Sequence, residues 1–411
     1  MNNYLFLILA ILLFSYLLDL AVGLLNLRSS SPDLPEEFVG VYDAGQYARS
    51  QEYTLATTRF SQIQATVSLV LTLIFILAGG FNVIDGLARS YGFSSIPTGL
   101  IFSALVALLS TSLNLPFTIY STFVIEQRFG FNTTTWATFI VDGLKVVLLS
   151  IVLGGPLLAG ILWFFETCGA FAWLYCWIVS VIFVLIIQFL APVLLMPLFN
   201  KFTPLAEGEL KEAITGYARG QHFALQGIYT MDGSKRSTRA NAFFTGFGRY
   251  RRIVFFDTLM DKLSTSEIVA VLAHEMGHYK QKHIFSMMVL SILQMGVMFF
   301  ILSFFLDNKG LFAAFGMENH SVYAGLVFFG FLYSPISTLV AVGFNAFSRR
   351  NEYQADRFAA RTGADGEALI SGLKKLSVSN LANLTPHPLN VFLHYSHPPI
   401  LARIAALRRV T

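Results

Sequence analysis

Two histidines with a glutamate beside the first form the segment of this chain best suited to chemistry. His274, Glu275 and His278 occur in the order HEMGH, and helix positions i and i+4 project from the same face. Both imidazoles can therefore reach one metal ion while the glutamate lies beside it. The pattern predicts a catalytic zinc site, in which three protein ligands leave one position for water. We interpret Glu275 as the general base that takes a proton from that water.

A second acidic cluster offers the third ligand. Glu352 begins the run EYQAD, and a carboxylate completes the His/His/Glu set of thermolysin-type zinc sites. Asp356, one helical turn further on, can accept the second ring N–H of a ligand histidine and fix its tautomer. The alternative for Glu352 is a surface ion pair with Arg349 or Arg350. The alternative for the two histidines is a helix whose imidazoles only make hydrogen bonds or face solvent.

Donors for the oxyanion of a tetrahedral intermediate are expected near the C-terminus. His394 and His397 lie in the run HYSHPP, and Arg403 follows. Each is of the type that stabilises developing negative charge. The residues alone do not choose between the two histidines.

Composition places the site in a membrane protein. Hydrophobic residues make up 55% of the 411 residues and charged residues 13%, against about 25% charged in soluble domains. Several apolar runs reach the roughly 20 residues that cross a bilayer. We expect a mainly α fold with about seven transmembrane helices, at residues 4–27, 65–88, 97–121, 136–165, 171–198, 284–306 and 321–347. The first is expected to be a retained span, because it has no basic leader and no small-residue cleavage site.

The basic residues define an orientation. Twelve Lys and Arg lie between Lys201 and Lys282, and nine occur from Arg349 onward. By the positive-inside rule both segments face the cytoplasm, with the N-terminus outside. The expected regions are a five-span N-terminal part, a cytoplasmic catalytic insert, two further spans and a catalytic tail, at residues 1–198, 199–283, 284–347 and 348–411. Basic stretches interleaved with aromatics are missing from the sequence, so a nucleic-acid partner is not expected.

The insert reads as a small α+β unit. An amphipathic helix is expected to start at residues 203–205, with strands at 228–231, 240–245 and 253–257. Ser264 and Glu267 fit a capping box, so a helix carrying both motif histidines should begin there.

Polar residues inside the apolar runs are expected to face water or one another. Asp19, Asp142, Lys145 and Gln188 are of this kind, and unpaired charge in lipid is expensive. Asp142 and Lys145 are three residues apart and can pair. The only cysteines, Cys168 and Cys176, allow one bridge or two free thiols.

At these motifs the chain resembles the type I CAAX prenyl proteases, which are integral-membrane zinc metalloendopeptidases. The resemblance rests on residues 273–278 (AHEMGH), 348–356 (SRRNEYQAD) and 394–399 (HYSHPP). Further matching blocks are residues 123–132 (FVIEQRFGFN), 197–202 (PLFNKF), 234–237 (SKRS) and 241–244 (NAFF).

The resemblance implies a chamber enclosed by seven tilted helices, with the metal facing inward. It also implies that Asn241, with Ala242 and Phe243, binds the substrate backbone on an edge strand, and that His397 and Arg403 support the oxyanion or orient the site. Strand addition suits a peptidase because main-chain hydrogen bonds do not depend on sequence.

We therefore expect a zinc endopeptidase acting on peptides at the membrane, prenylated or otherwise membrane-associated. The expected location is a bacterial inner membrane, or the endoplasmic reticulum if the source is eukaryotic. One alternative is a catalytically idle zinc-binding chamber that serves as a receptor or quality-control partner, which has no need of Glu275. Another is a transporter, but transport sites lie near the bilayer midplane, away from a basic insert.

Overall fold

The computed structural model describes residues 2–223, 225–245, 251–362 and 365–410. Its α-helices are α1 (Asn3–Arg28), α2 (Ala44–Leu77), α3 (Gly80–Arg89), α4 (Ser95–Tyr120), α5 (Trp136–Leu149), α6 (Gly155–Thr167), α7 (Ala172–Leu190), α8 (Met196–Phe199), α9 (Glu209–Gly220), α10 (Asp257–Met260), α11 (Thr265–Lys280), α12 (His283–Leu302), α13 (Lys309–Ala314), α14 (Val322–Arg361), α15 (Gly366–Ser379), α16 (Pro388–His394) and α17 (Ile400–Leu407). The strands are β1 (Phe202–Pro204), β2 (Gly227–Met231), β3 (Ala242–Thr245) and β4 (Arg252–Phe256).

Shorter helical segments join some of these elements. The π-helical segments η2 (Ser121–Glu126), η3 (Ser150–Gly154) and η5 (Ala191–Leu195) continue α4, α5 and α7. The 3-10 turns are η1 (Glu36–Phe38), η4 (Gly169–Phe171) and η6 (Gly233–Lys235). Pro192 lies within η5, and Pro116 lies one turn before η2. Proline has no N–H to donate, and such π-helical adjustments are one way that a membrane helix accommodates it.

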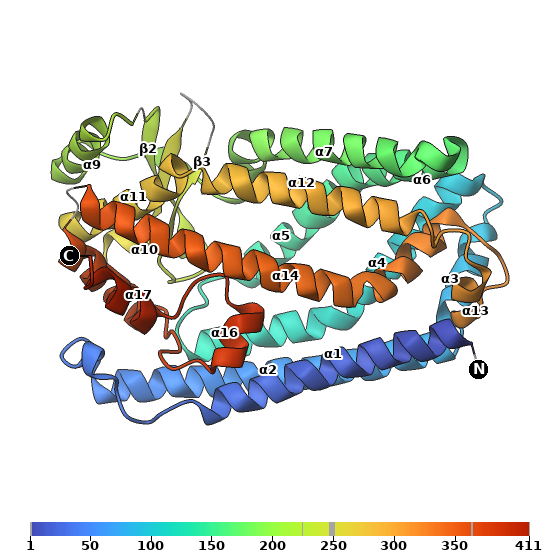
Figure 1. Ribbon diagram of the computed structural model, residues 1–411, viewed down its shortest axis with the longest axis horizontal. Coiled ribbons are helices and arrows are strands. Elements are labelled where there is room, and N and C mark those ends of the chain that lie inside the picture. Colours follow the sequence, from blue (N-terminus) through green and yellow to red (C-terminus); the bar gives the residue numbers. More distant parts are fainter. Residues whose placement is uncertain (1, 224, 246–250, 363–364, 411) are drawn as a thin grey trace.

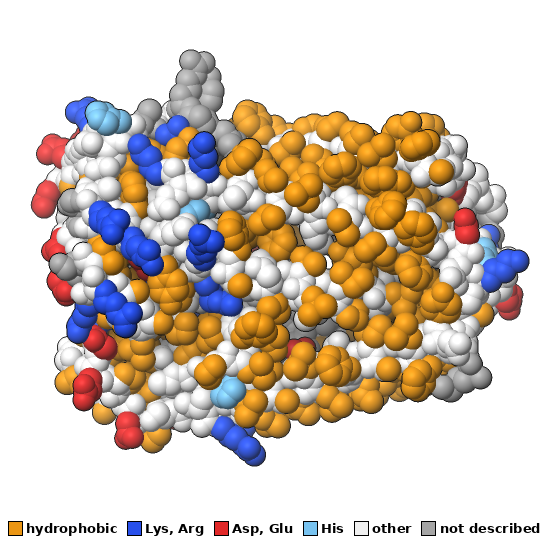
Figure 2. Space-filling view, in the orientation of Figure 1, with side chains coloured by type: hydrophobic (Ala, Val, Ile, Leu, Met, Phe, Trp, Pro, Cys, Tyr) orange, Lys and Arg blue, Asp and Glu red, His pale blue; other side chains and the backbone are white. Residues whose placement is uncertain are grey.

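Seven helical stretches in the described chain are long and apolar enough to cross a membrane. They run lengthwise through the molecule, while the sheet, α9, α11 and α17 gather at one end (Figure 1). The stretches are Asn3–Arg28, Ala44–Leu77, Ser95–Glu126, Trp136–Thr167, Gly169–Phe199, His283–Leu302 and Val322–Arg361. On the face shown in Figure 2, apolar and uncharged groups cover these stretches, whereas most Lys, Arg, Asp and Glu lie at the end that holds the sheet and a few lie at the opposite end. The expected helical membrane fold is confirmed.

One expected span is wrong. The sequence predicted a second span at 65–88, but α2 begins at Ala44 and ends at Leu77. Gly79 then adopts a left-handed conformation with φ 69°, and the separate helix α3 begins after it. Glycine takes this conformation without a steric penalty, so an apolar run that looks continuous is divided into two elements.

The sheet lies beside the first motif helix. Its strand order is β1-β2-β4-β3, with β2 parallel to β4 and the other pairs antiparallel. The three expected strands are confirmed with small shifts in their ends, but β1 was not expected. Residues 203 and 204 lie in β1, and the amphipathic helix starts later, at Glu209. β3 is at the end of the strand order and is therefore an edge strand.

The polar groups of the apolar runs have partners. Asp142 accepts two hydrogen bonds from Arg236, at 2.7 and 3.0 Å, and lies 3.9 Å from Lys145. Asp19 lies 3.6 Å from the ring of His394, and Gln188 lines two cavities. Both cysteines are free thiols, and that of Cys176 contacts the carbonyl oxygen of Ile161.

Candidate active site

Helix α11 presents the HExxH motif because its start is well defined. The hydroxyl of Ser264 accepts from the amide of Glu267, and the Glu267 carboxylate accepts from the amide of Ser264, which completes the predicted capping box. Glu267 also binds Ser371 at 2.6 Å and Lys375 at 2.9 Å, both on α15. Its side chain is 5% exposed. These contacts fix the rotation of α11, and hence the direction of its histidines.

A glycine allows the second motif helix to approach. A Cβ placed on Gly277 would lie 2.9 Å from the Cα of Ala355 and 3.1 Å from its carbonyl oxygen. Such contacts are too short for any larger residue without movement of the backbone. The close approach of α11 and α14 brings Glu352 and Asp356 to the histidines. Gly277 is therefore a structural requirement of the site that the motif alone did not reveal.

The three predicted ligands converge. His274, His278 and Glu352 each offer a ligand atom, and these atoms all lie within 4.8 Å of one another. The two Nε2 atoms are 3.2 Å apart, and they lie 3.4 and 3.3 Å from the oxygens of Glu352. A tetrahedral ion with ligands at about 2.05 Å has ligand atoms about 3.3 Å apart. The spacing therefore fits a metal ion.

Glu352 is suited to hold a cation. It is 4% exposed, and its Oε2 is buried without a hydrogen bond of good geometry. Arg403 lies 3.2 Å from that oxygen as an ion-pair partner. The alternative ion pair with Arg349 does not form, because this guanidinium donates to the carbonyl oxygens of Val391 and Tyr395. A buried carboxylate with a free lone pair is a strong metal ligand.

His274 has a carboxylate behind it. Its Nδ1 lies 2.8 Å from Asp356, and Arg403 binds the same carboxylate through two hydrogen bonds of 2.9 and 2.6 Å. Burial opposes protonation of the ring, but the bonds to Asp356 and Glu352 outweigh it and raise the pKa of His274 to about 9. Because Asp356 accepts from the Nδ1–H, Nε2 is the ring nitrogen left to face the other two ligand residues. The arrangement expected for Asp356 is present.

Glu275 faces a cavity of about 400 Å³ that reaches the ligand cluster. The cavity is also lined by Asn241, Ala242 and Phe243, by the ligand residues, and by His397 and Arg403. The predicted ligands, Glu275, the substrate-binding residues, His397 and Arg403 therefore border one space, whereas Asp356 and His394 do not line it. A partly buried glutamate on the face of α11 beside the two histidines can exchange protons with a molecule bound there.

His397 and His394 lie in different places. The Nε2 of His397 is 3.3 Å from Glu352, and its side chain is 65% exposed toward the cavity. His394 contacts Asp19 on α1 instead. Of the two histidines that sequence reasoning left open, the structure brings only His397 to the ligand cluster.

The start of β3 is anchored from outside the sheet. Arg239 binds the carboxylate of Glu126 at 3.0 and 3.1 Å and the hydroxyl of Tyr53, and its guanidinium lies 4.3 Å over the ring of Phe131. The amide of Phe256 on β4 then donates to the backbone carbonyl oxygen of Asn241 at 3.0 Å. Two matching blocks, at 123–132 and 234–237, are explained by these contacts and by the bridge between Asn132 and Ser237.

Sequence reasoning missed several residues around the site. His283 and Gln354 lie behind His278, Arg239 and Glu126 hold β3, and Gly277 permits the helix contact. His283 is the third histidine within ten residues, which is a signal that could have been used. Gln354 lies two residues after Glu352 on α14. Its spacing in the sequence does not show that its side chain faces His283, which depends on how α14 is rotated.

Known families match both halves of this chain. Residues 23–201 match the family described as CAAX prenyl protease N-terminal, five membrane helices, and residues 204–411 match peptidase family M48. The fold and the site together define a membrane-embedded metalloprotease. The chain belongs to peptidase family M48, among the CAAX prenyl proteases, as the motifs indicated.

Individual relatives are similar over nearly the whole length. The CAAX prenyl protease 1 homolog of Oryza sativa subsp. japonica is 36% identical over 97% of this chain and 96% of its own. CAAX prenyl protease 1 of Saccharomyces cerevisiae is 34% identical over 93% of this chain and 90% of its own. The crystal structure of S. mikatae Ste24p matches with a TM-score of 0.94 at 31% identity and covers 99% of both chains.

Proposed function

We propose that this metalloprotease uses one Zn²⁺ held by His274, His278 and Glu352 to hydrolyse a peptide bond in substrates bound along β3. The observation that carries the proposal is the convergence of two imidazole nitrogens and a buried carboxylate at the spacing of a tetrahedral ion. When bound, the ion polarises the scissile carbonyl and lowers the pKa of water toward about 7.

The remaining steps belong to residues of the chain. The peptide lies extended along the free edge of β3, beside Asn241, Ala242 and Phe243, where main-chain groups that are not bonded to β4 offer hydrogen bonds. Glu275 takes a proton from the attacking water and later passes it to the leaving amine. His397 and Arg403 donate to the oxyanion or orient the site, and Asp356 holds His274 in the required tautomer.

The proposed substrates are prenylated peptides that end in a CAAX box, cut to release three residues. The support is that the relatives are named CAAX prenyl proteases, together with the apolar surroundings of the cleft. A cavity of about 770 Å³ beside Phe243 and Phe244 is lined by Ala191, Pro192 and Met288 among others. The idle-receptor alternative is not favoured, because the relatives over the full chain are proteases.

The proposed orientation has the sheet and α11 in the cytoplasm. It is supported by the concentration of Lys and Arg at the end of the molecule that carries the sheet (Figure 2). The proposed location is a bacterial inner membrane, or the endoplasmic reticulum membrane if the source is eukaryotic. Labelling of single cysteines introduced at exposed positions of α9, from each side of sealed vesicles, tests the orientation.

The decisive experiment compares the wild type with Glu275→Gln, purified in detergent. Zinc content is measured first, and then cleavage of a prenylated CAAX peptide and of its unprenylated counterpart. We expect unchanged zinc and a loss of turnover of about 10²- to 10⁴-fold. Glu209→Gln, an exposed change on α9 in the same segment, should retain full activity. Equal turnover by wild type and Glu275→Gln would remove Glu275 from the mechanism.

A further inference from the structure

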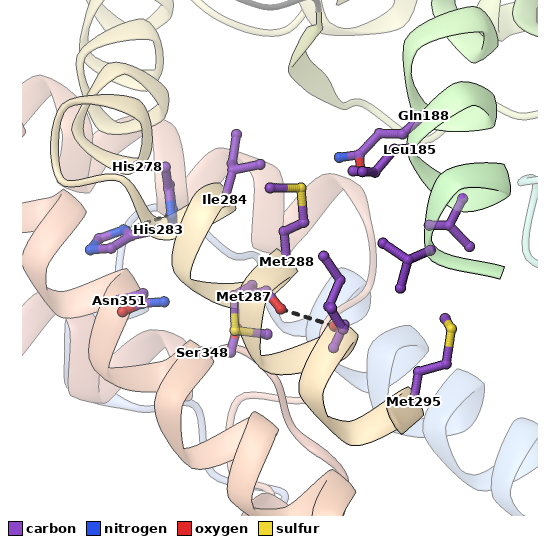
Figure 3. Close-up of a pocket in the computed structure, with 14 residues that line it drawn as sticks. Leu185, Gln188, His278, His283, Ile284, Met287, Met288, Met295, Ser348 and Asn351 are labelled. Carbon is purple, nitrogen blue, oxygen red and sulfur yellow. Dashed lines mark hydrogen bonds between the residues drawn. The ribbon is translucent and has the colours of Figure 1, made fainter. Parts of the chain in front are cut away.

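A third histidine stands directly behind the metal-facing ring of His278. The Nδ1 atoms of His278 and His283 are 3.2 Å apart, and the two rings meet nearly edge to face at 76° (Figure 3). The other nitrogen of His283, Nε2, lies 2.9 Å from the side-chain oxygen of Gln354. His283 is 5% exposed. The three side chains form a continuous hydrogen-bonded row that starts at the ligand cluster.

The two imidazoles of the row can donate in either of two directions, depending on their tautomers. Only one of these arrangements permits metal binding. Between two neutral imidazoles one Nδ1 must donate and the other accept. If His278 is to offer the lone pair of Nε2 to a metal, its own proton is on Nδ1. His283 must then accept at Nδ1 and carry its proton on Nε2, which requires an acceptor. The oxygen of Gln354 supplies that acceptor.

We propose that His283 and Gln354 are positioning residues that hold His278 in the tautomer and rotation needed to bind the metal. This inference rests on the metal site of the proposed function and deepens it. Gln354 accepts from His283, and His283 accepts from His278. Each group is fixed by the next, so that the Nε2 lone pair of His278 points at Glu352 and His274.

The turn between α11 and α12 brings His283 to this position. Lys282 takes a left-handed conformation with φ 59°, so the chain reverses and α12 begins at His283. Gln281 secures the same junction by donating to the backbone carbonyl of Gln354 at 2.9 Å. The residues that follow, Ile284 and Met288, line the neighbouring cavity with apolar side chains (Figure 3).

The two ligand histidines are thus supported differently. His274 donates to a carboxylate that Arg403 neutralises. His278 donates to the neutral imidazole of His283, which in turn donates to the neutral amide of Gln354. Removal of a hydrogen-bond partner of a ligand histidine typically lowers the metal affinity about 10- to 100-fold. Removing the row should therefore weaken metal binding without changing any ligand.

The test measures affinity for Zn²⁺ alone, by competition with a chromophoric chelator on the metal-free protein in detergent. His283→Phe keeps the ring volume and removes the acceptor, and Gln354→Met keeps the length and removes the amide. Gln354→Glu retains an acceptor oxygen at the same place. Gln281→Ala is the matched control, since it disturbs the same junction but not the row. His278→Ala tests the metal site itself.

We expect His283→Phe to lose about 10- to 100-fold in affinity and Gln354→Met somewhat less. Gln354→Glu and Gln281→Ala should bind as the wild type does. With Co²⁺ in place of Zn²⁺, the visible absorption of the two weakened variants should change in shape, because the ring orientation changes. A merely structural residue would leave that spectrum unaltered.

Three results would overturn the inference. Wild-type affinity in both His283→Phe and Gln354→Met would show that the row does not support the metal. An equal loss in Gln281→Ala, or in Gln354→Glu, would assign the effect to packing of the junction. Unchanged affinity in His278→Ala would instead remove the proposed metal site, which separates failure of the proposed function from failure of the row. If His283→Phe does not fold, the two Gln354 variants still decide the question.

Discussion

The two ends of this molecule are stabilised by different interactions. At the catalytic end the interior holds charge, since Glu267, His274, Glu352, Asp356 and Arg403 are all less than 9% exposed. In the membrane-spanning helices the large apolar side chains point outward, and few of them are buried (Figure 2). Buried clusters around Phe102 and Tyr323 and around Phe299 and Tyr333 pack these helices together, and lipid, which is as apolar as leucine, solvates apolar surface that stays exposed.

The difference shows where the chain tolerates change. A buried charge depends on each of its partners, because an unpaired one costs several kcal/mol. An apolar side chain in lipid depends on no particular neighbour. The catalytic end should therefore be sensitive to changes of a few tenths of an ångström, whereas the spanning helices should accept substitutions over most of their surface.

The same substitution on two glycines provides the largest contrast. Gly277→Ala places a Cβ 2.9 Å from the backbone of Ala355, whereas Gly343→Ala, in the spanning part of α14, meets nothing within 4 Å. For Gly277→Ala we expect activity to fall about 100-fold, as misplacement of catalytic groups by about 1 Å does. Overpacking should also lower stability by about 1 to 3 kcal/mol.

Gly343→Ala should be neutral or stabilising by up to about 1 kcal/mol, because alanine favours the helix. The two variants are compared by measuring their peptidase activity, zinc content and thermal unfolding. Similar behaviour of both would show that the approach of α11 to α14 is not what positions the ligands.

One ion pair links the two regions and provides the next prediction. Asp142 belongs to a spanning helix, but its main partner, Arg236, belongs to the catalytic segment. Arg236 also donates to the carbonyl oxygen of Phe199 at 2.8 Å. Asp142→Asn should destabilise the protein by about 1 to 2 kcal/mol, less than a fully buried pair, because both side chains are partly exposed.

A double-mutant cycle with Arg236→Gln measures the pair itself. We expect a coupling of about 1 kcal/mol in the unfolding free energy, and a smaller activity loss in the double variant than the two single losses predict. Strictly additive effects would mean that the pair does not join the spanning helix to the segment that carries β3.

The capping residue of α11 should give a smaller, pH-dependent effect. Burial opposes ionisation of Glu267, but hydrogen bonds from Lys375 and Ser371 outweigh it and hold the pKa of this carboxyl below its ordinary value of 4.5. A carboxyl with a lowered folded pKa stabilises the protein above its unfolded pKa. That contribution is lost as the pH falls through the folded value.

Glu267→Gln should therefore cost about 1 kcal/mol at neutral pH, and its difference from the wild type should shrink below about pH 4. Unfolding midpoints of the metal-free proteins across pH provide the measurement. The exposed change Glu209→Gln should show no such pH dependence. If the stability difference between Glu267→Gln and the wild type were the same at all pH values, the loss would be due to altered packing and not to the lost charge.

The chemistry of the site was largely readable from the sequence, because it depends on residue type and helical spacing. The HExxH spacing, the capping box at Ser264 and the acidic run at Glu352 each have a local cause. The structure brings these residues together, and their roles as ligands and base stay predictions. The choice of His397 over His394 required the path of the whole chain, since His394 is held by Asp19 about 375 residues earlier in sequence.

The features that the sequence did not predict depend on how separate elements lie relative to one another. Gly79 divides an apolar run that looked like one span, and nothing local shows that its φ is positive. Asp142 was expected to pair with Lys145 three residues on, whereas its shorter contact is with Arg236, which is distant in sequence. The helix predicted from residues 203–205 was displaced by β1, because Phe202 and Pro204 align with β2 instead.

The smallest effect is expected at an exposed apolar position of a membrane-spanning helix. Leu339 on α14 is 73% exposed, so truncation of its side chain opens no cavity inside the protein. Leu339→Ala should therefore change stability by less than about 0.5 kcal/mol and leave activity unchanged. Leu272 on α11 is 0% exposed. Leu272→Ala should lower the free energy of unfolding by about 2 to 5 kcal/mol, because it leaves a cavity. Measured by unfolding in one detergent, equal losses at the two positions would break the distinction between a packed catalytic end and a lipid-solvated shell.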